Sequence, residues 1–162
     1  MLAKIFMFSK MELGEYPDNP ELLRLDDEVR QLVRALSAEY EENGLIISVK
    51  SLAPSTVLAD PEQLRRVLIN IMDNSVKYKT KDVATMTISL HEKDCEYLLS
   101  LCDDGPGVSE YELPHLFEVF YRSDPARQNP NRGSGLGLAI AANAIQRMKG
   151  TIEAKINENG GL

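Results

Sequence analysis

The chain lacks any apolar run that approaches the roughly 20 residues needed to cross a bilayer as a helix. The apolar stretch Leu2–Met7 is too short, and has the wrong flanking residues, for a secretory signal peptide. Cysteine is scarce as well, because only Cys95 and Cys102 occur, seven residues apart in what reads as one strand. Their side chains would then point to opposite faces, which excludes a bridge between them and is typical of a reducing cytosol.

Positive charge is in deficit: 18 lysines and arginines face 25 aspartates and glutamates, which gives a formal net charge of −7. This balance argues against nucleic acid and against an anionic membrane surface as partners. Charges more than about 8 Å apart are largely screened at physiological salt, so an anionic small ligand would depend on nearby basic side chains. The candidates for that role are Lys77, Arg122, Arg127 and Arg132.

The remaining composition predicts one globular domain with its own core. Hydrophobic residues make up 43% and charged residues 27% of 162 positions, and no internal repeat or low-complexity segment occurs. Helical spacing of apolar residues predicts three long helices, over residues 26–44, 60–78 and 136–148. Strands are expected at residues 22–25, 45–49, 57–59, 85–91, 96–102 and 151–156.

Local signals mark where the helices begin and end. Asp26 is expected to cap the first helix, and Gly44 to end it. Asp60 is expected to cap the second helix, with Pro61 at its first position. The third helix should close at Gly150.

Shorter features fill the intervals between these elements. Glu92–Asp94 should join two strands into a hairpin, and Ser109 should cap a short helix that runs toward Phe117. Residues 121–132 carry two prolines and no apolar periodicity, so they are expected to form a mobile loop. A turn is expected at Asn157–Gly161.

The second predicted helix carries a stripe of polar side chains beside its apolar face. Asn70, Asn74 and Lys77 lie on this stripe, and a half-solvated helix flank is its ordinary explanation. Asparagine, however, costs up to about 0.7 kcal/mol relative to alanine inside a helix, so two of them suggest a need for neutral oxygen atoms. Mg²⁺ takes hard oxygen ligands and shares them with phosphates, which a carboxamide suits. For a nucleotide ligand such as ATP, Lys77 would place its positive charge beside the phosphates. Tyr78 would present the flat face of its ring to adenine. The packing face consists of Leu64, Val67, Leu68, Ile71 and Ser75.

A tight acidic turn follows the strand at residues 96–102. The sequence Asp103-Asp-Gly-Pro-Gly107 would form a turn in any case, which is the ordinary interpretation. In the functional interpretation, Asp103 accepts a hydrogen bond from the amino group of adenine. Gly105 and Gly107 let the backbone approach the base, and Val108 lines the apolar side.

A glycine-rich run, Gly133–Leu138, precedes the third helix. It differs from the dinucleotide-binding fingerprint, which needs glycine where Leu138 stands and a strand before it, and no Walker pattern occurs in the chain. Taken alone, such a run is a flexible loop as often as it is a phosphate-binding site. Before an amphipathic helix, its free N–H groups would attract phosphate. The residues expected to bind phosphate through their backbone are Ser134, Gly135, Leu136, Gly137 and Leu138.

The three motifs, in this order, predict an ATP site built without a Walker loop. Together they resemble the ATP-binding domain of sensor histidine kinases, within the superfamily that also contains gyrase, mismatch-repair and chaperone ATPases. The other branches usually carry glutamate in place of Asn70 and aspartate in place of Lys77, so the resemblance favours the kinase branch. It covers about residues 22–162, with an N box at 70–78, glycine boxes at 103–107 and 133–138, and an F box at 117–122.

The resemblance implies a layered α/β fold, an α+β two-layer sandwich of the Bergerat type. In it, a mixed β-sheet is covered on one face by helices. Residues 1–20 resemble the tail of a dimerisation helix plus a linker, and residues 21–162 the ATP-binding domain without its last strand. The helix with the phosphate-accepting histidine is not found, so we expect a fragment of a longer kinase. The expected location is a cytoplasmic domain, and anchoring of the parent protein in the inner membrane is left open.

The resemblance implies the roles already given for the motif residues, and it adds catalytic roles for Asn70 and Arg122. Asn74 would hold Mg²⁺, and Asn70 would lie close to the metal and the phosphates, where it takes part in catalysis. Arg122 would stabilise charge on the transferring phosphoryl group. The alternative interpretation is that Arg122 is an ordinary surface residue. His91 is expected to be an ordinary sheet residue, and His115 a packing or surface residue of the short helix.

The implied reaction transfers the γ-phosphoryl group of Mg·ATP to a histidine outside this chain, and from there to an aspartate on a response regulator. The expected partners are therefore ATP, the dimerisation and histidine-phosphotransfer domain of the parent kinase, and the response regulator. Two alternatives remain open. One is a non-catalytic scaffold that responds to nucleotide. The other is an ATP hydrolase that clamps its partners, which would need a carboxylate to activate water, such as that of Asp73.

Overall fold

The computed structural model describes residues 18–122, 135–158 and 160–162. Most of the expected dimerisation-helix tail, Arg127, Arg132, Ser134 and most of the expected mobile loop therefore lie outside the described residues. Within the three described ranges, no helix has the length and apolar character that crossing a membrane requires.

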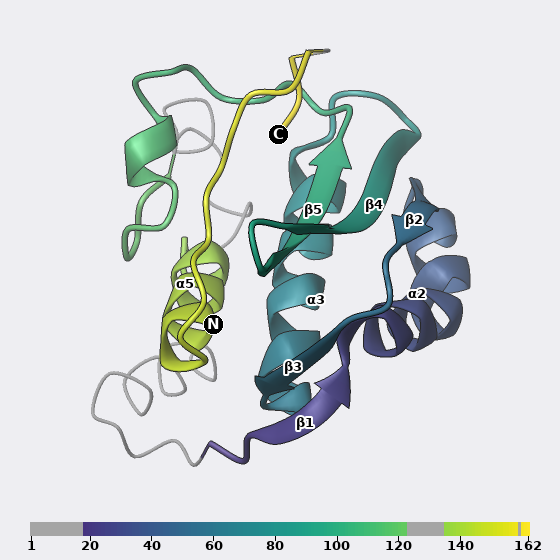
Figure 1. Ribbon diagram of the computed structural model, residues 1–162. Coiled ribbons are helices and arrows are strands. Elements are labelled where there is room, and N and C mark those ends of the chain that lie inside the picture. The colour runs from purple at the N-terminus through teal and green to yellow at the C-terminus, as the bar shows by residue number, and fades with distance from the viewer. Residues whose placement is uncertain (1–17, 123–134, 159) are drawn as a thin grey trace.

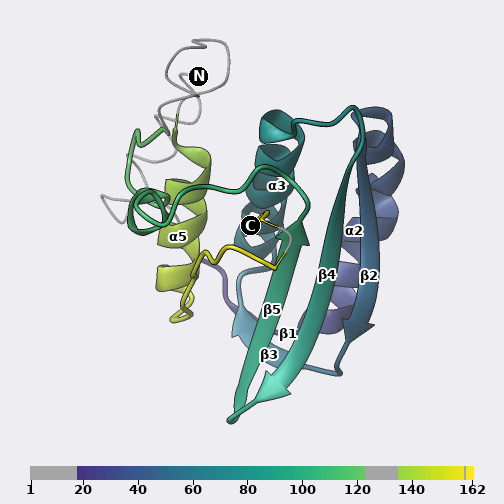
Figure 2. The ribbon, with the colours of Figure 1, turned by 90° about the horizontal axis from the view of Figure 1, so that it is seen from above.

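The described elements form two layers (Figure 1). β2 (Leu45–Leu52), β4 (Ala84–Lys93) and β5 (Glu96–Asp103) form a sheet in the order β2-β4-β5. β2 and β4 are parallel, whereas β4 and β5 are antiparallel, so the sheet is mixed. α2 (Leu25–Glu42) and α3 (Pro61–Tyr78) cover one face of it, as Figure 2 shows. The mixed sheet with helices on one face that the sequence predicted is confirmed.

Two smaller parts complete the fold. β1 (Glu21–Arg24) and β3 (Thr56–Ala59) pair antiparallel and form a separate two-stranded sheet. α5 (Gly137–Arg147) lies beside α3 and away from the three-stranded sheet (Figure 2). Val67 of α3 and Ile140 of α5 share a small apolar cluster that holds the two helices together.

The main core lies between the three-stranded sheet and the helices α2 and α3. Met86, Ile88 and Leu90 alternate along β4 and are almost fully buried, as their period of two predicted. The packing face of α3 differs in part from the sequence prediction, because Met72 is fully buried whereas Ile71 is only half-buried. The two side chains take different directions on the helix, because Met72 belongs to the main core whereas Ile71 packs against both that core and the cluster shared with α5.

α3 begins where its local signals predicted. Pro61 occupies the first helical position, and the Asp60 carboxylate accepts a hydrogen bond from the N–H of Gln63 at 3.0 Å. Gly44, which follows α2, has a φ of +76° and ends that helix as expected.

The expected cap at Asp26 is wrong. α2 begins at Leu25, because β1 runs directly into the helix and Arg24 takes the capping position. Asp26 lies in the first helical turn, where its carboxylate accepts hydrogen bonds from the N–H of Ser55 at 3.0 Å and from the Arg24 guanidinium at 2.8 Å. The bond from Arg24, joined by the N–H of Ser55, lowers the pKa of Asp26 to about 2.

The hairpin between β4 and β5 is confirmed, with a tighter turn than expected. Asp94 and Cys95 form the turn, and both have positive φ, at 53° and 65°, as a two-residue hairpin turn of type I′ requires. The placement of Cys95 inside a strand was therefore wrong. Both cysteines are free and exposed in the described structure.

Two helix predictions need correction. The helix expected after Ser109 is only a 3₁₀ turn at Leu113–His115, preceded by a turn in which Glu112 accepts hydrogen bonds from Ser109. After α5, Lys149 takes the left-handed conformation, with a φ of +61°, in place of the expected Gly150. A Cβ on Gly150 would lie 3.1 Å from a methyl carbon of Ile145, so a larger residue there would require the Ile145 side chain to shift.

The strand expected at residues 151–156 is absent from the described structure. A strand needs a neighbour for its backbone groups, and no described backbone hydrogen bond pairs this segment with β5. The following turn is confirmed, since the N–H of Asn157 donates to the carbonyl of Gly161 at 2.8 Å.

Candidate functional site

A cavity of about 580 Å³ lies between α3, the turn after β5, the 3₁₀ segment and the start of α5. Its walls carry most of the residues that the motifs predicted, although these come from four separate parts of the chain. The predicted residues that line it are Asn70, Asn74, Lys77, Tyr78, Asp103, Gly105, Gly107, Val108, Arg122, Gly135, Gly137 and Leu138. The structure therefore brings the three motifs to one cavity.

Two predicted residues stand apart from this group. Ser134 lies outside the described residues. The side chain of Leu136 is fully buried in the apolar cluster between α3 and α5, next to Ile140 and Ala141. Any contact of Leu136 with a ligand would therefore be through its backbone, which is what the sequence predicted.

One end of the cavity presents the two carboxamides of α3 to the start of α5. A Cβ built on Gly137 would lie 3.4 Å from Oδ1 of Asn70 and 3.9 Å from Oδ1 of Asn74. Both amide oxygens therefore face the first turn of α5, where helical N–H groups have no intrahelical partner. Asn70 is 6% exposed and Asn74 is half-buried.

This donor set fits Mg²⁺ that arrives with a polyphosphate. Mg²⁺ keeps several waters and takes few protein ligands, the remainder being phosphate oxygens. The carboxamide oxygens of Asn70 and Asn74 are hard ligands of the required kind. Within the described ranges, no group of three or more histidine, cysteine, aspartate or glutamate side chains is placed to hold a metal by itself.

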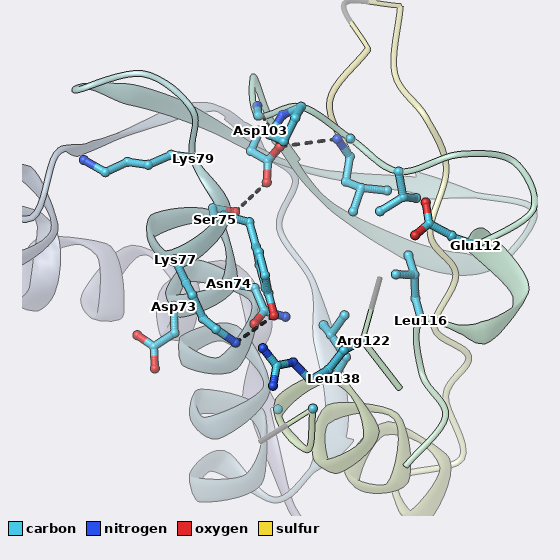
Figure 3. A pocket seen from close by; sticks show the side chains of 18 of the residues that line it. Asp73, Asn74, Ser75, Lys77, Lys79, Asp103, Glu112, Leu116, Arg122 and Leu138 are labelled. Carbon is cyan, nitrogen blue, oxygen red and sulfur yellow. Dashed lines mark hydrogen bonds between the residues drawn. The ribbon is translucent and has the colours of Figure 1, made fainter. Parts of the chain in front are cut away.

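Positive charge gathers at the same end. The Lys77 ammonium donates a hydrogen bond to the Tyr78 hydroxyl at 2.8 Å and lies 4.4 Å from the centre of that ring. Figure 3 shows Lys77 pointing toward Asn74, with Arg122 across from it. Two cations beside neutral oxygens make this end suitable for an anion.

The other end of the cavity is built around the Asp103 carboxylate. Its Oδ2 accepts a hydrogen bond of 2.6 Å from the Ser75 hydroxyl, drawn as a dashed line in Figure 3. Its Oδ1 accepts hydrogen bonds from the N–H groups of Gly105, at 3.0 Å, and Leu162, at 3.3 Å. The Asn157 side chain donates to the Asp103 carbonyl at 2.7 Å, so backbone and carboxylate are both fixed.

The glycines of the acidic turn are required by close approach. Gly107 has a φ of +62°, and a Cβ there would collide with the carbonyl oxygen of Gly160. A Cβ on Gly105 would lie 3.0 Å from the Asp103 carboxylate. Gly107 is therefore explained by packing against Gly160 and Gly105 by the nearby Asp103 carboxylate, whereas the sequence suggested approach to a base.

Several lining residues were missed by the sequence interpretation. Ser75 was assigned to the packing face, yet its hydroxyl bonds Asp103 across 28 positions of sequence. Leu116 and Glu112 also line the cavity. Their spacing in the sequence carries no signal for this, because the 3₁₀ segment reaches the cavity only through the tertiary fold.

Asp73 lines the cavity as well, but its carboxylate is held from another side. The Tyr40 hydroxyl of α2 donates to Oδ1 of Asp73 at 3.0 Å. Tyr40 is 6% exposed, and this burial, together with the Asp73 carboxylate, raises the pKa of Tyr40 above its usual range. In Figure 3, Asp73 points away from the ends of Lys77 and Asn74.

Comparison with known proteins adds a family relationship. Residues 59–162 match the family described as Histidine kinase-, DNA gyrase B-, and HSP90-like ATPase. Among curated proteins, the chain is 36% identical to Sensor protein SphS of Synechococcus elongatus over 105 residues, or 61% of this chain and 25% of SphS. It is 34% identical to Signal transduction histidine-protein kinase BaeS of Escherichia coli, over 79% of this chain and 27% of BaeS. The chain thus spans about a quarter of the length of these relatives.

Solved structures share the fold. Histidine kinase AdeS of Acinetobacter baumannii has a TM-score of 0.75 and 24% identity, and the match covers 99% of this chain and 72% of that one. Full-length ShkA in complex with AMPPNP has a TM-score of 0.80 and 24% identity, covering 98% of this chain and 32% of ShkA. At these identities the likeness concerns the fold alone.

Proposed function

Because this chain belongs to the histidine kinase-, DNA gyrase B- and HSP90-like ATPase family, we propose that it is the ATP-binding domain of a sensor histidine kinase. In this proposal it binds Mg·ATP and donates the γ-phosphoryl group to a histidine outside residues 1–162. The kinase branch is supported by its curated relatives, such as Signal transduction histidine-protein kinase BaeS.

The observation that carries the proposal is the contrast between the two ends of the cavity. Asp103 offers a fixed hydrogen-bond acceptor at one end, and Lys77, Arg122 and the two asparagines offer cations and neutral oxygens at the other. A nucleoside triphosphate has the complementary chemistry, with an amino group on its base and a polyanion at its far end. ATP therefore fits with adenine at Asp103 and phosphates toward α5.

Each residue at the phosphate end has a proposed role. Asn74 holds Mg²⁺, which when bound neutralises charge on the phosphate oxygens, and Asn70 lies beside the phosphates. Lys77 binds phosphate by its charge, and Tyr78 packs its ring on adenine. Arg122 stabilises the charge that spreads over the transferring group. Phosphoryl transfer asks little covalent chemistry of side chains, so positioning and charge suffice.

The accepting histidine is proposed to lie outside this chain because neither of its own histidines is suited. His91 lies in β4 and shares a hydrogen bond with the Ser51 hydroxyl at 3.3 Å. His115 lies in the 3₁₀ turn, where its ring bonds Glu118 at 2.7 Å and stacks on Tyr121. We propose the dimerisation and histidine-phosphotransfer domain of the parent kinase as acceptor, with residues 1–20 as the tail and linker that lead to it.

A response regulator is the proposed final acceptor. A histidine kinase of the same fold, ThkA, has been solved in complex with the response regulator protein TrrA, at a TM-score of 0.74 and 18% identity to this chain. The hydrolase alternative has less support. It needs a carboxylate that activates water, and the carboxylate of Asp73 is engaged by Tyr40.

Calorimetric titration with ATP, with and without Mg²⁺, tests the binding step. We expect Mg²⁺-dependent binding by the wild-type chain, and loss of that dependence in Asn74→Ala. Asn43→Ala is the matched control, because Asn43 caps the C-terminal end of α2, where its side chain donates to the Glu39 carbonyl, and it does not line the cavity. Failure of the wild-type chain to bind ATP would overturn the proposal.

The transfer step needs a second measurement. The chain alone, incubated with γ-labelled ATP, should acquire no stable label. Addition of the parent's histidine-containing domain should produce label on that domain, and only with an intact Asn74. Stable label on the chain alone, or steady release of ADP over many turnovers without an acceptor, would contradict the transfer role.

A further inference from the structure

The Asp103 carboxylate has little capacity left for a ligand. An ionised carboxylate offers about four lone-pair sites. Oδ1 already accepts from the N–H groups of Gly105 and Leu162, and Oδ2 accepts from the Ser75 hydroxyl. One of the two lone-pair sites of Oδ2 therefore remains, on a residue that lines the cavity.

The number of open sites matters because the two purines present different edges. Adenine has one amino group beside ring nitrogens that only accept. Guanine has a carbonyl in place of that amino group, and beside it a ring N–H and a second amino group. A carboxylate oxygen with two open lone-pair sites can accept the two adjacent donors of guanine, whereas a single open site suits the one amino group of adenine.

We propose that Ser75 determines the purine specificity of this pocket, by occupying the acceptor site on Asp103 that guanine would need. The inference rests on the proposed ATP-binding function and deepens it. Asp103 alone would recognise either purine through its carboxylate. Ser75 restricts that carboxylate to one fixed orientation and one open site.

The geometry supports a dedicated contact. The Ser75 hydroxyl has one proton, and its two acceptors are Oδ2 of Asp103 at 2.6 Å and the Ile71 carbonyl at 3.4 Å. The shorter and charge-assisted bond is the stronger, so the proton goes to Asp103. Ser75 is 6% exposed, and its hydroxyl is therefore poorly placed to exchange this partner for water. The residue acts through Asp103 and is a positioning residue.

Titration with Mg·ATP and Mg·GTP tests the proposal through the ratio of the two affinities. We expect the wild-type chain to prefer ATP, and Ser75→Ala to lower the ATP-to-GTP ratio by about tenfold, the effect of losing one hydrogen bond to a charged group. Ser75→Thr keeps the hydroxyl and should retain most of the preference. If Ser75→Ala does not fold, the nearly isosteric Ser75→Cys replaces it, because a thiol is a weak donor.

A matched control separates specificity from stability. Ser55 is also buried, and its hydroxyl also lies within hydrogen-bond distance of an aspartate, 3.4 Å from Oδ1 of Asp26, but Ser55 does not line the cavity. Ser55→Ala should lower the melting temperature and leave the affinity ratio unchanged. A merely structural role for Ser75 would give the same result for Ser75→Ala.

The possible outcomes separate a failure of this inference from a failure of the proposed ATP-binding function. An unchanged ratio in Ser75→Ala overturns the inference alone, and so does a wild-type chain that binds ATP and GTP equally well. A wild-type chain that binds neither nucleotide overturns the proposed function and the inference with it. A ratio that falls in Ser75→Ala and recovers in Ser75→Thr supports the assignment.

Discussion

The N–H of Phe120 donates a hydrogen bond to the carbonyl of Gly135 at 3.2 Å, which joins two parts of the chain separated by residues 121–134. Phe120 has a φ of +63° and Gly135 a φ of +69°, so both residues adopt the left-handed conformation at this crossing. The pairing places Arg122 and Gly135 together on the wall of the cavity. The F box and the second glycine box thus meet through backbone contacts.

Gly135→Ala should disrupt this crossing. A Cβ there would lie 2.7 Å from the Tyr121 carbonyl oxygen and 2.9 Å from the Phe120 carbonyl carbon, so the backbone must shift. We expect a loss of about 1–3 kcal/mol in the free energy of unfolding, measured by urea denaturation, and weaker ATP binding. Gly160→Ala is the control, because its φ of +87° gives comparable strain but a Cβ there meets nothing within 4 Å. Equal effects of the two substitutions would show that only backbone strain matters.

Asp26→Asn should destabilise the protein in a pH-dependent way. Asp26 has a pKa of about 2, below the ordinary value of 3.8. As pH falls, the Asp26 carboxylate of the unfolded chain is therefore protonated before that of the folded protein. The stabilisation is complete above about pH 4 and is lost as pH falls toward 2. The variant should lose about 2 kcal/mol at pH 7, the contribution of a hydrogen-bonded ion, and match the wild type once the pH is below about 2.

Denaturation curves across this pH range provide the measurement. Asp27→Asn is the matched control, because Asp27 is exposed on the same helical turn. It should leave stability within about 0.5 kcal/mol of the wild type. A difference between Asp26→Asn and the wild type that stays constant from pH 7 to pH 2 would contradict the ion-pair explanation.

The sequence predicted the features that depend on residues close together in the chain. It missed those that depend on partners far apart in the chain. α3 and its cap depend on Asp60 and Pro61, which are neighbours in the chain, and both were predicted. Asp26 was misread because its partner Ser55 lies 29 positions away. Ser75 was assigned to packing for the same reason, since its bond to Asp103 depends on how β5 packs against α3.

The strand at residues 151–156 was overpredicted because apolar alternation describes only one side of a pairing. A strand also requires a neighbour's backbone, and the described structure gives this segment none. The three motifs, by contrast, could be joined into one site because each has its own local signal. The resemblance predicted that the three motifs meet at one site, and in the structure residues of all three line one cavity.

Lys77→Met should weaken the binding of ATP and leave the binding of adenosine nearly unchanged. The ammonium group lies at the phosphate end of the cavity, where its attraction depends on the charge of the ligand. We expect about a tenfold loss for ATP, which diminishes as salt is added. Lys93→Met is the control, since Lys93 lies at the hairpin end of β4, opposite the end of β5 that carries Asp103. Equal losses for ATP and adenosine would argue against a phosphate contact.

Gly137→Ala should affect stability and ligand binding in opposite directions. Gly137 is the first residue of α5, and alanine is preferred to glycine within a helix, so unfolding should cost about 0.5–1 kcal/mol more. The added methyl group would lie in ordinary contact range of Oδ1 of Asn70 and Asn74, at 3.4 and 3.9 Å, and would cover both oxygens. We therefore expect a higher melting temperature together with at least about tenfold weaker binding of Mg·ATP, whereas adenosine, which lacks phosphates, should bind as before. A variant that is more stable and binds Mg·ATP as tightly as the wild type would show that the phosphates do not pass between α3 and the start of α5.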